Sequence, residues 1–236
     1  SLKYRYPVEV HTVTTEDGYI LEMHRIPHGR DNNNDPKVVR PIVFLMHGLL
    51  SSSADWVIMG PGSAFGYLLA EAGYDVWMGN ARGNYYSTKH VSLNPDSLFN
   101  TAFWKFSWDE IGRLDLPTMI DHALAVTGHQ RLHYVGHSQG TTTFFVMASL
   151  RPDYNEKIIS MHAFAPVAYM VSIILAITSL LGVGQFLPNT NINQWAGEAL
   201  CRDQVVTQAL CSNIVFLMGG WNEDQHNAVN IKAETN

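Results

Sequence analysis

The chain has 236 residues, of which 46% are hydrophobic and 15% charged, and this is enough to bury a sizeable core. The formal net charge is −6, and lysine and arginine are scattered singly, which excludes the basic surface of a nucleic-acid-binding protein. Cysteine is scarce: the spacing of Cys201 and Cys211 permits a disulfide, and two free buried thiols fit the sequence equally well.

The first predicted element is a β-hairpin. Residues 8–14 and 18–26 are rich in β-branched and aromatic residues, and Glu16-Asp17-Gly18 between them is a turn signal. A polar loop follows over residues 27–36. Residues 41–46 then form a nearly continuous apolar run, which is typical of a strand buried on both faces of a parallel sheet.

Helices and strands alternate after this point. The predicted elements are a helix over 63–72, a strand over 74–78, a helical segment over 109–127 that Pro117 must break or restart, a strand over 132–135, a helix over 141–150 and a strand over 158–164. The last of these strands is expected in the core, like the earlier ones. An initial hairpin followed by such alternation predicts an α/β fold with a doubly wound, mostly parallel sheet.

Residues 158–197 contain no Asp, Glu, Lys or Arg, and this stretch is long enough for a transmembrane helix. Pro166, Pro188 and the polar residues 189–194 argue against a membrane span. The first part of the stretch also continues the strand alternation of the domain. We therefore expect a buried strand followed by an apolar helix over 167–181.

The strongest chemical motif is Gly136-His137-Ser138-Gln139-Gly140. A Gly-x-Ser-x-Gly pattern is weak by itself, but here it directly follows a predicted strand and directly precedes a predicted helix. That is the placement of a nucleophile elbow, in which a serine sits in a strained conformation at the tip of a sharp turn. The alternative is a serine that merely caps the helix after a glycine turn.

The glycines of the motif have a steric reason. The residues two before and two after the serine come close to one another and to the neighbouring strand, so only Gly136 and Gly140 fit there. The tip exposes the Ser138 hydroxyl to a base and to substrate. The backbone N–H of Gln139, at the start of the following helix, is predicted to point towards a developing oxyanion.

A second motif, Met46-His47-Gly48-Leu49-Leu50, follows the strand over 41–46. The other oxyanion donor of a fold with this elbow lies after such a strand. We predict that the donor is the backbone N–H of Leu49, which Gly48 makes approachable. His47 and His137 are interpreted as structural histidines rather than as catalytic bases.

Several segments together resemble the acid lipase family of α/β-hydrolases, which includes the gastric and lysosomal acid lipases. The resemblance runs from about Tyr6 to Phe216. It is carried by His47-Gly48-Leu49-Leu50, Ala72-Gly73-Tyr74-Asp75-Val76-Trp77, Gly79-Asn80-Ala81-Arg82-Gly83-Asn84, Phe106-Ser107-Trp108-Asp109-Glu110, Asp115-Leu116-Pro117, the residues from Leu132 to Thr141, and Ala165-Pro166-Val167-Ala168.

The resemblance implies an α/β-hydrolase core over residues 1–166 and a cap, or lid, over residues 167–236. It implies Ser138 as the nucleophile, Leu49 and Gln139 as the oxyanion amides, and a lid disulfide between Cys201 and Cys211. It also implies hydrolysis of neutral lipid esters, such as acylglycerols or cholesteryl esters, in a secreted or lysosomal setting. The apolar cap would meet a lipid–water interface. No cofactor is implied, and the histidines show no spacing of a metal site.

A base and an acid are missing from this assignment. In this fold the order along the chain is Ser, then Asp or Glu, then His, on late strands. The histidines after Ser138 are His162, in a predicted strand, and His226, in a polar stretch of the cap. Asp224 and His226 lie too close together in one loop to orient each other as acid and base. The sequence therefore predicts a core truncated before its last strands, with the triad acid and histidine outside this chain.

Three explanations remain open. The residues given are part of a longer polypeptide that completes the triad, or the lipase is cleaved in the cap and a C-terminal chain of the same polypeptide supplies the acid and histidine. Alternatively, the protein is a catalytically inactive, lipase-like lipid-binding or interaction protein. We favour the first explanation. A serine hydrolase acting through an acyl-enzyme on Ser138 is then expected of the full-length protein, and the chain alone is expected to be inactive.

Overall fold

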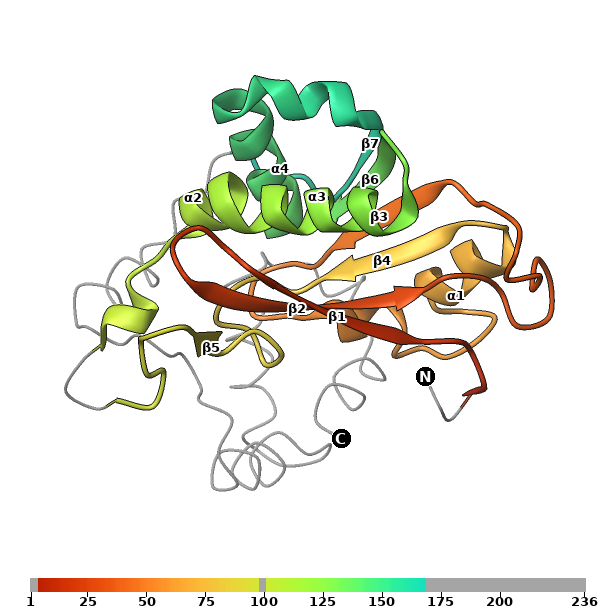
Figure 1. Cartoon of the computed structure of the whole chain (residues 1–236), viewed down its shortest axis with the longest axis horizontal. Helices are drawn as coiled ribbons and strands as arrows, with labels where there is room; N and C mark the ends of the chain where they lie inside the picture. The colour runs from red at the N-terminus through yellow and green to blue at the C-terminus, as the bar shows by residue number, and fades with distance from the viewer. Residues whose placement is uncertain (1–3, 98–100, 169–236) are drawn as a thin grey trace, which may run out of the picture. The chain divides into compact units, whose positions relative to one another are not determined.

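The computed structural model describes residues 4–97 and 101–168, and the structural statements here concern those residues. A seven-stranded sheet has the strand order β1-β2-β4-β3-β6-β7, with the short β5 paired to β2 (Figure 1). The strands are β1 (Glu9–Thr14), β2 (Tyr19–Ile26), β3 (Ile42–Met46), β4 (Asp75–Gly79), β5 (Lys89–His90), β6 (Leu132–His137) and β7 (Ile158–Phe164).

The predicted hairpin is confirmed. β1 and β2 pair antiparallel, with Glu9 opposite Arg25 and Thr14 opposite Ile20. The turn between them closes through a hydrogen bond from the Gly18 N–H to the Thr15 carbonyl, and Gly18 has a φ of 97°. Only glycine adopts that backbone conformation without a steric cost.

The doubly wound, mostly parallel sheet is also as expected. β2 pairs antiparallel with β4, whereas β4, β3, β6 and β7 are parallel to one another in that order. All five residues of β3 and all five of β4 are buried, because helices cover both faces of the sheet at this point. The carboxyl ends of β3, β4, β6 and β7 therefore meet at one edge of the sheet.

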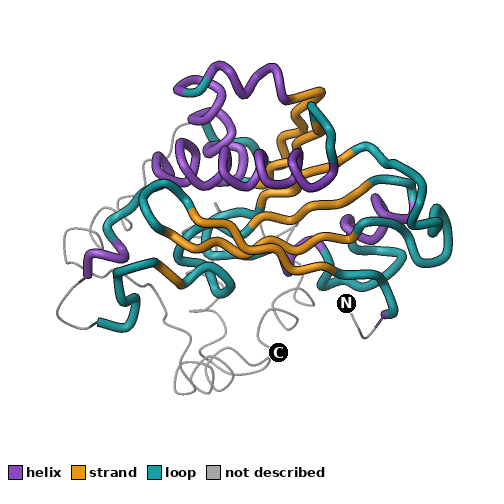
Figure 2. The backbone as a smooth tube through the Cα atoms, viewed as in Figure 1, coloured by secondary structure: helices purple, strands orange, loops and turns teal. Residues whose placement is uncertain are grey.

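The helices are α1 (Phe65–Glu71), α2 (Trp108–Glu110), α3 (Leu116–Thr127) and α4 (Gln139–Leu150), and Figure 2 shows how they flank the strands. A π-helical turn, Ile111–Asp115, joins α2 to α3. Pro117 is the second residue of α3 and directly follows the π-helical turn, in which the Leu116 N–H donates to the Ile111 carbonyl oxygen. The helical backbone over 109–127 is therefore not ended by Pro117: it widens to a π turn before the proline and continues as α3 from Leu116.

Two apolar clusters lie on opposite faces of the sheet. Alternate residues of each strand point to opposite faces, so Phe44 and Met46 of β3 join one cluster while Val43 and Leu45 join the other. The first cluster includes residues of α3 and α4, and the second includes residues of α1. The result is a helix–sheet–helix sandwich, with α1 opposite α3 and α4 (Figure 1).

The prediction that 158–164 is a buried core strand is wrong in its burial. β7 forms over those residues and pairs with β6, but none of its seven residues is fully buried, and Ile159 and Phe164 are exposed. Among the described residues β7 is the terminal strand of the sheet. Its apolar composition indicated burial, whereas at the end of the strand order one edge of β7 is unpaired among the described residues, and Ile158 and Met161 pack against the core only in part.

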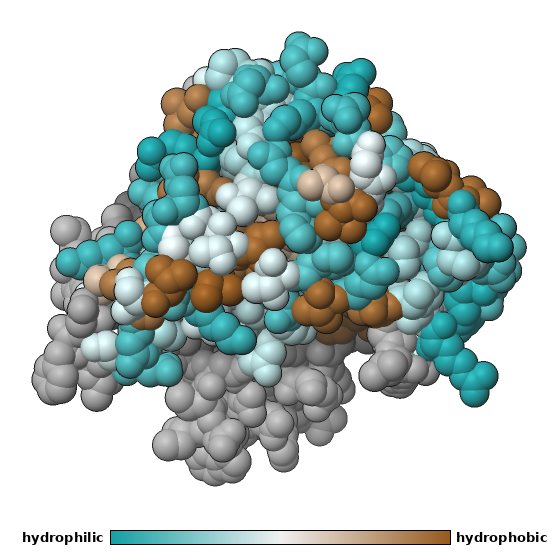
Figure 3. All heavy atoms as spheres, viewed as in Figure 1, coloured by the Kyte–Doolittle hydropathy of each residue, from teal (hydrophilic) through white to brown (hydrophobic). Residues whose placement is uncertain are grey.

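Several predictions lie outside the described residues: His226 and the pair Cys201 and Cys211. The predicted helix over 167–181 and the cap over 167–236 lie outside them except for residues 167 and 168. Within the described part of the chain, no helix is long and apolar enough to cross a membrane. Figure 3 shows that, on one face, apolar side chains form small areas between polar ones.

Candidate active site

Ser138 lies at the junction of β6 and α4, where the strand ends at His137 and the helix begins at Gln139. Its φ is 49° and its ψ is −116°, which lies outside the regions that residues with a side chain normally occupy. Such a conformation costs of the order of 1–3 kcal/mol and persists only where the surrounding structure enforces it. The predicted sharp strand-to-helix turn with a strained serine at its tip is therefore present.

Gly136 and Gly140 make this turn possible. A Cβ atom on Gly136 would lie 2.8 Å from the carbonyl carbon of Gly140, and a Cβ atom on Gly140 would lie 2.5 Å from the carbonyl oxygen of Met46. Both distances are shorter than any side chain tolerates against backbone atoms. The steric reason given from the sequence holds: the start of α4 packs directly on the end of β3.

The backbone around Ser138 is held by hydrogen bonds from two directions. The Ser138 N–H donates to the carbonyl oxygen of Phe164 over 2.9 Å, which ties the elbow to the end of β7. The Ser138 carbonyl oxygen accepts the Thr141 N–H over 2.9 Å and the Thr141 hydroxyl over 2.6 Å. The Thr141 Oγ1 atom in turn accepts the N–H of Val167 over 2.9 Å. The segment after β7 therefore braces the elbow.

The loop after β3 lies against the elbow. A Cβ atom on Gly48 would be 3.1 Å from Nδ1 of His137 and 3.3 Å from Cβ of Ser138, so any side chain here would require its neighbours to move by a few tenths of an ångström. Leu49, the next residue, is partly buried, and Leu50 is exposed with a φ of 58°. The structure thus brings the Gly48–Leu49 peptide, Ser138 and Gln139 together at the carboxyl edge of the sheet.

His47 is buried on the other side of this loop. Its Nδ1–H donates to the Gly48 carbonyl oxygen over 2.7 Å, and its Nε2 accepts the Ala81 N–H over 3.1 Å and the Asn84 Nδ2–H over 3.1 Å. Burial lowers the pKa of His47 and so favours the neutral ring. With both nitrogens occupied, His47 has no free lone pair to act as a base on Ser138.

A buried ion-pair cluster supports the loop that follows β4. The guanidinium of Arg82 binds Oδ1 of Asp115 through Nε at 2.8 Å and through an NH2 group at 2.7 Å, and binds Oδ2 of Asp17 at 2.6 Å. The Arg82 backbone N–H also donates to Asp115 over 2.9 Å. The Arg82 guanidinium lies 4.0 Å from the centre of the Tyr19 ring. Sequence reasoning missed this cluster, although Arg82 and Asp115 both lie in segments that carry the family resemblance.

Asp115 is completely buried, at the junction of the π-helical turn and α3. Burial raises the pKa of Asp115 to about 6, while Arg82 opposes that rise by favouring the carboxylate. A charge removed from water in this way depends on its partner, so the hairpin turn, the loop after β4 and the start of α3 are held together.

No histidine in residues 4–97 or 101–168 forms a hydrogen bond with the Ser138 hydroxyl. His162 lies in β7, and its Nε2 is 2.9 Å from the hydroxyl of Ser160. The described residues also contain no group of three or more His, Cys, Asp or Glu suited to a metal ion. The described part of the site therefore brings together the strained Ser138 and the Gly48 loop, without a histidine hydrogen-bonded to the serine hydroxyl.

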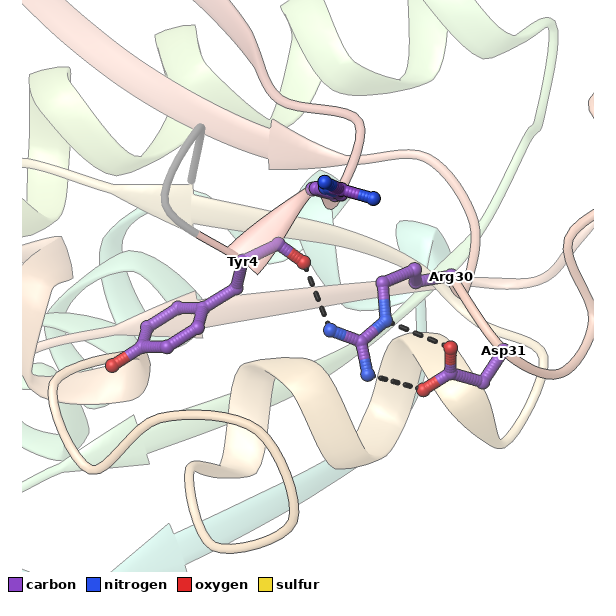
Figure 4. A pocket seen from close by; sticks show the side chains of 4 residues that line it. Tyr4, Arg30 and Asp31 are labelled. Carbon is purple, nitrogen blue, oxygen red and sulfur yellow. Dashed lines mark hydrogen bonds and ion pairs between the residues drawn. The ribbon is translucent and has the colours of Figure 1, made fainter.

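A cavity of about 520 Å³ lies elsewhere, lined by Tyr4, Arg5, Arg30 and Asp31 (Figure 4). The Arg30 guanidinium donates to the Tyr4 carbonyl oxygen over 2.9 Å and to Asp31 over 2.8 Å. Tyr4 and Arg5 precede β1, and Arg30 and Asp31 follow β2. The start of β1 lies beside the end of β2, and β2 is antiparallel to β4, so the cavity lies at the end of the sheet opposite Ser138. The cavity is not part of the candidate site.

Two family models match the chain. A model described as a partial alpha/beta-hydrolase lipase region matches residues 2–60, and a model described as the alpha/beta hydrolase fold matches residues 41–193. The first match contains the loop after β3, and the second contains the elbow. The matches therefore include both parts of the candidate site.

Curated relatives include lipases of insects and mammals. The chain is 49% identical to Lipase 1 of Drosophila melanogaster over 94% of its length, 45% identical to gastric triacylglycerol lipase of Bos taurus over 91%, and 42% identical to lysosomal acid lipase/cholesteryl ester hydrolase of Macaca fascicularis over 98%. It spans 49%, 56% and 59% of those proteins, respectively, and so about half of their length or slightly more.

Among solved structures, a Pseudomonas aeruginosa protein described as an epoxide hydrolase superposes with a TM-score of 0.50. The superposition covers 97% of this chain and 63% of that protein, at 15% sequence identity. At that identity the likeness concerns the fold alone.

Proposed function

The chain belongs to the α/β-hydrolase fold family, and on that premise we propose that it carries the nucleophile of a lipase that hydrolyses carboxylic esters of neutral lipids. The resemblance to the acid lipases is borne out by relatives that are themselves named gastric and lysosomal lipases. Ser138 is the proposed nucleophile. Acylglycerols and cholesteryl esters are the proposed substrates, because those relatives carry these substrates in their names.

The observation that carries the proposal is the backbone of Ser138. A serine with φ of 49° and ψ of −116°, between a parallel strand and a helix, has no structural advantage over glycine, which takes this conformation without strain. A strained backbone at one serine, in contact with the Gly48 loop, is typical of a nucleophile elbow, in which the turn exposes the serine hydroxyl.

In the proposed mechanism, the Ser138 hydroxyl attacks the ester carbonyl and forms a tetrahedral intermediate. The backbone amides of Leu49 and Gln139 donate to its oxyanion; the loss of one such donor costs on the order of 3 kcal/mol of barrier in comparable sites. A histidine outside the described residues takes the hydroxyl proton and returns it to the leaving alcohol. Water then releases the acid from the acyl-enzyme, and no cofactor takes part.

We further propose that residues 167–236 form the cap and meet the lipid–water interface, and that the protein acts in a secreted or lysosomal setting. The names of the gastric and lysosomal relatives support this setting. A disulfide between Cys201 and Cys211 stays a prediction, since both lie outside the described residues.

The proposal is tested on the complete natural polypeptide that contains this sequence. A serine-directed phosphonate probe is expected to label Ser138, with the site located by peptide mass spectrometry. Ser138→Ala should abolish labelling, and Ser92→Ala, which changes an exposed serine in a loop, should leave it unchanged. Hydrolysis of a short-chain triacylglycerol emulsion, a cholesteryl ester and a p-nitrophenyl ester is measured in parallel.

Each outcome of these assays bears on the proposal. Folded, intact protein that neither reacts with the probe nor hydrolyses any ester contradicts it and supports a lipid-binding protein without catalysis. Turnover of the p-nitrophenyl ester without turnover of either lipid supports the nucleophile and contradicts the lipid substrates. Intact-mass measurement of the native protein separates one continuous polypeptide from a cleaved, two-chain enzyme.

A further inference from the structure

We propose that His47 is a positioning residue of the oxyanion hole: its ring holds the Gly48 carbonyl on one side of the loop and thereby turns the Leu49 amide towards Ser138. The inference rests on the proposed function. It assigns roles to His47 and to its hydrogen-bond partner Asn84, which the proposed mechanism does not use. It assigns His47 an effect on the reaction through a backbone amide, without contact with the substrate. Neither residue acts as a base or nucleophile.

The first step concerns the direction of one peptide unit. The Gly48–Leu49 peptide bond is not cis, and in a trans peptide the carbonyl and the following N–H point in opposite directions. His47 Nδ1–H holds the Gly48 carbonyl over 2.7 Å. The Leu49 N–H therefore points away from the His47 ring.

The second step concerns what lies on each side of the loop. In the sheet β3 lies between β4 and β6. The His47 ring contacts Ala81 and Asn84, which follow β4, whereas Gly48 approaches Ser138, which follows β6. A carbonyl held on the β4 side places the amide on the β6 side, where the nucleophile lies.

The third step concerns the proton on His47. Two donors, the Ala81 N–H and the Asn84 Nδ2–H, face Nε2, so Nε2 carries no proton and Nδ1 must carry it. The Asn84 amide cannot turn over, because its Oδ1 accepts the N–H groups of Tyr86 and Ser87 over 3.0 and 3.1 Å. Asn84 thus determines the tautomer that His47 needs to donate to Gly48.

The ring is also kept uncharged. Burial is the largest cause of the lowered pKa of His47; the hydrogen bond to the Gly48 carbonyl and the charge of Asp55 oppose it, and His137 adds the smallest lowering effect. The supporting loop is itself anchored, since Arg82, next to Ala81, binds the buried Asp115 through both its backbone N–H and its guanidinium. His47 therefore presents one fixed donor.

Two substitutions separate the two halves of the ring. The amide nitrogen of an asparagine side chain reaches the place of Nδ1, so His47→Asn keeps a donor for Gly48 and loses the acceptor for Ala81 and Asn84. The longer His47→Gln reaches the place of Nε2, so it keeps that acceptor and loses the donor to Gly48. His47→Gln is therefore expected to lose more activity than His47→Asn, and His47→Asn is expected to lose more stability than His47→Gln.

The measurements use the complete polypeptide and a p-nitrophenyl ester, with thermal unfolding recorded for each variant. His47→Gln is expected to lower kcat about 100-fold with KM changed less than threefold, because an oxyanion donor acts mainly in the transition state. His47→Asn should keep kcat within about tenfold of wild type while losing more stability, since it leaves the buried Ala81 N–H and one N–H of the partly buried Asn84 amide without an acceptor.

Wild type and Ser138→Ala give the reference for the proposed function. If both are inactive, the proposed function fails and this inference fails with it. If wild type is active and folded His47→Gln keeps its kcat, or if the two His47 variants lose kcat in proportion to their stability, only the inference fails. Nitrogen NMR of the His47 ring provides a second readout: a proton found on Nε2 contradicts the assignment.

Discussion

A Cβ atom placed on Gly48 would lie 3.3 Å from Cβ of Ser138, so the loop after β3 and the elbow after β6 are in contact across two neighbouring parallel strands. The two residues are far apart in the sequence and carry the two halves of the proposed chemistry. One half displays the hydroxyl, and the other directs an amide at the oxyanion. This separation is shorter than an ordinary van der Waals contact, so a side chain at position 48 would press on Ser138.

Gly48→Ala is therefore expected to lower kcat by about 10- to 100-fold, because the loop must shift by a few tenths of an ångström away from Ser138. The fold should survive, since the nearest atoms belong to side chains and not to backbone. Steady-state kinetics with thermal unfolding checks this. Gly62→Ala is the control: its Cβ atom would meet nothing within 4 Å, so it should leave kcat unchanged, although its φ of 85° makes alanine cost some stability.

The strain at Ser138 predicts an unusual order of stability. Ser138→Gly should be more stable than Ser138→Ala by about 1 kcal/mol. Glycine adopts a φ of 49° without strain, whereas alanine retains the strain of the serine. The greater freedom of glycine in the unfolded chain offsets part of this gain. Urea unfolding of the two inactive variants measures the difference. Equal stabilities would contradict the assignment of strain to the elbow.

Arg82→Met is expected to destabilise the fold by about 3–5 kcal/mol, because it leaves the completely buried Asp115 without its partner. Arg113→Met, which removes a half-exposed ion pair with Asp109, should cost less than about 0.5 kcal/mol. Chemical denaturation compares the two. A similar small loss in both variants would show that Asp115 does not depend on Arg82.

Glu71 predicts a dependence of stability on pH. Its carboxylate accepts the backbone N–H groups of Arg30, Asp31 and Asn32, and the pKa of Glu71 is lowered to about 2 by these bonds and the one from Tyr6, although burial opposes this. A lowered folded-state pKa means that its stabilisation is present above pH 4.5 and is lost as the pH falls towards 2.

Glu71→Gln should therefore be less stable than wild type at pH 7, by about 1–2 kcal/mol after allowing for solvent screening. The difference should shrink steadily below pH 4.5, because wild type then loses the same charge. Unfolding curves at a series of pH values test the trend. A difference between the two proteins that does not change with pH would contradict the role assigned to the carboxylate.

What the sequence determines by itself is local. The hairpin, the buried strands β3 and β4 and the elbow around Ser138 follow from patterns that span only a few residues: alternation, apolar runs, and glycine where a backbone comes too close for a side chain. The same patterns made Ser138 the candidate nucleophile. They constrain structure because their steric and solvation effects act between neighbours along the chain.

The tertiary structure alone decided the rest. Arg82 meets Asp17 and Asp115, and His47 meets Asn84, only after the sheet has brought separate loops together. The apolar β7 indicated burial, yet the strand order leaves it exposed in the described part of the chain. Burial and charge pairing are properties of what surrounds a residue in space, so a pattern along the chain can propose Ser138 but does not reveal which groups orient the amide facing it.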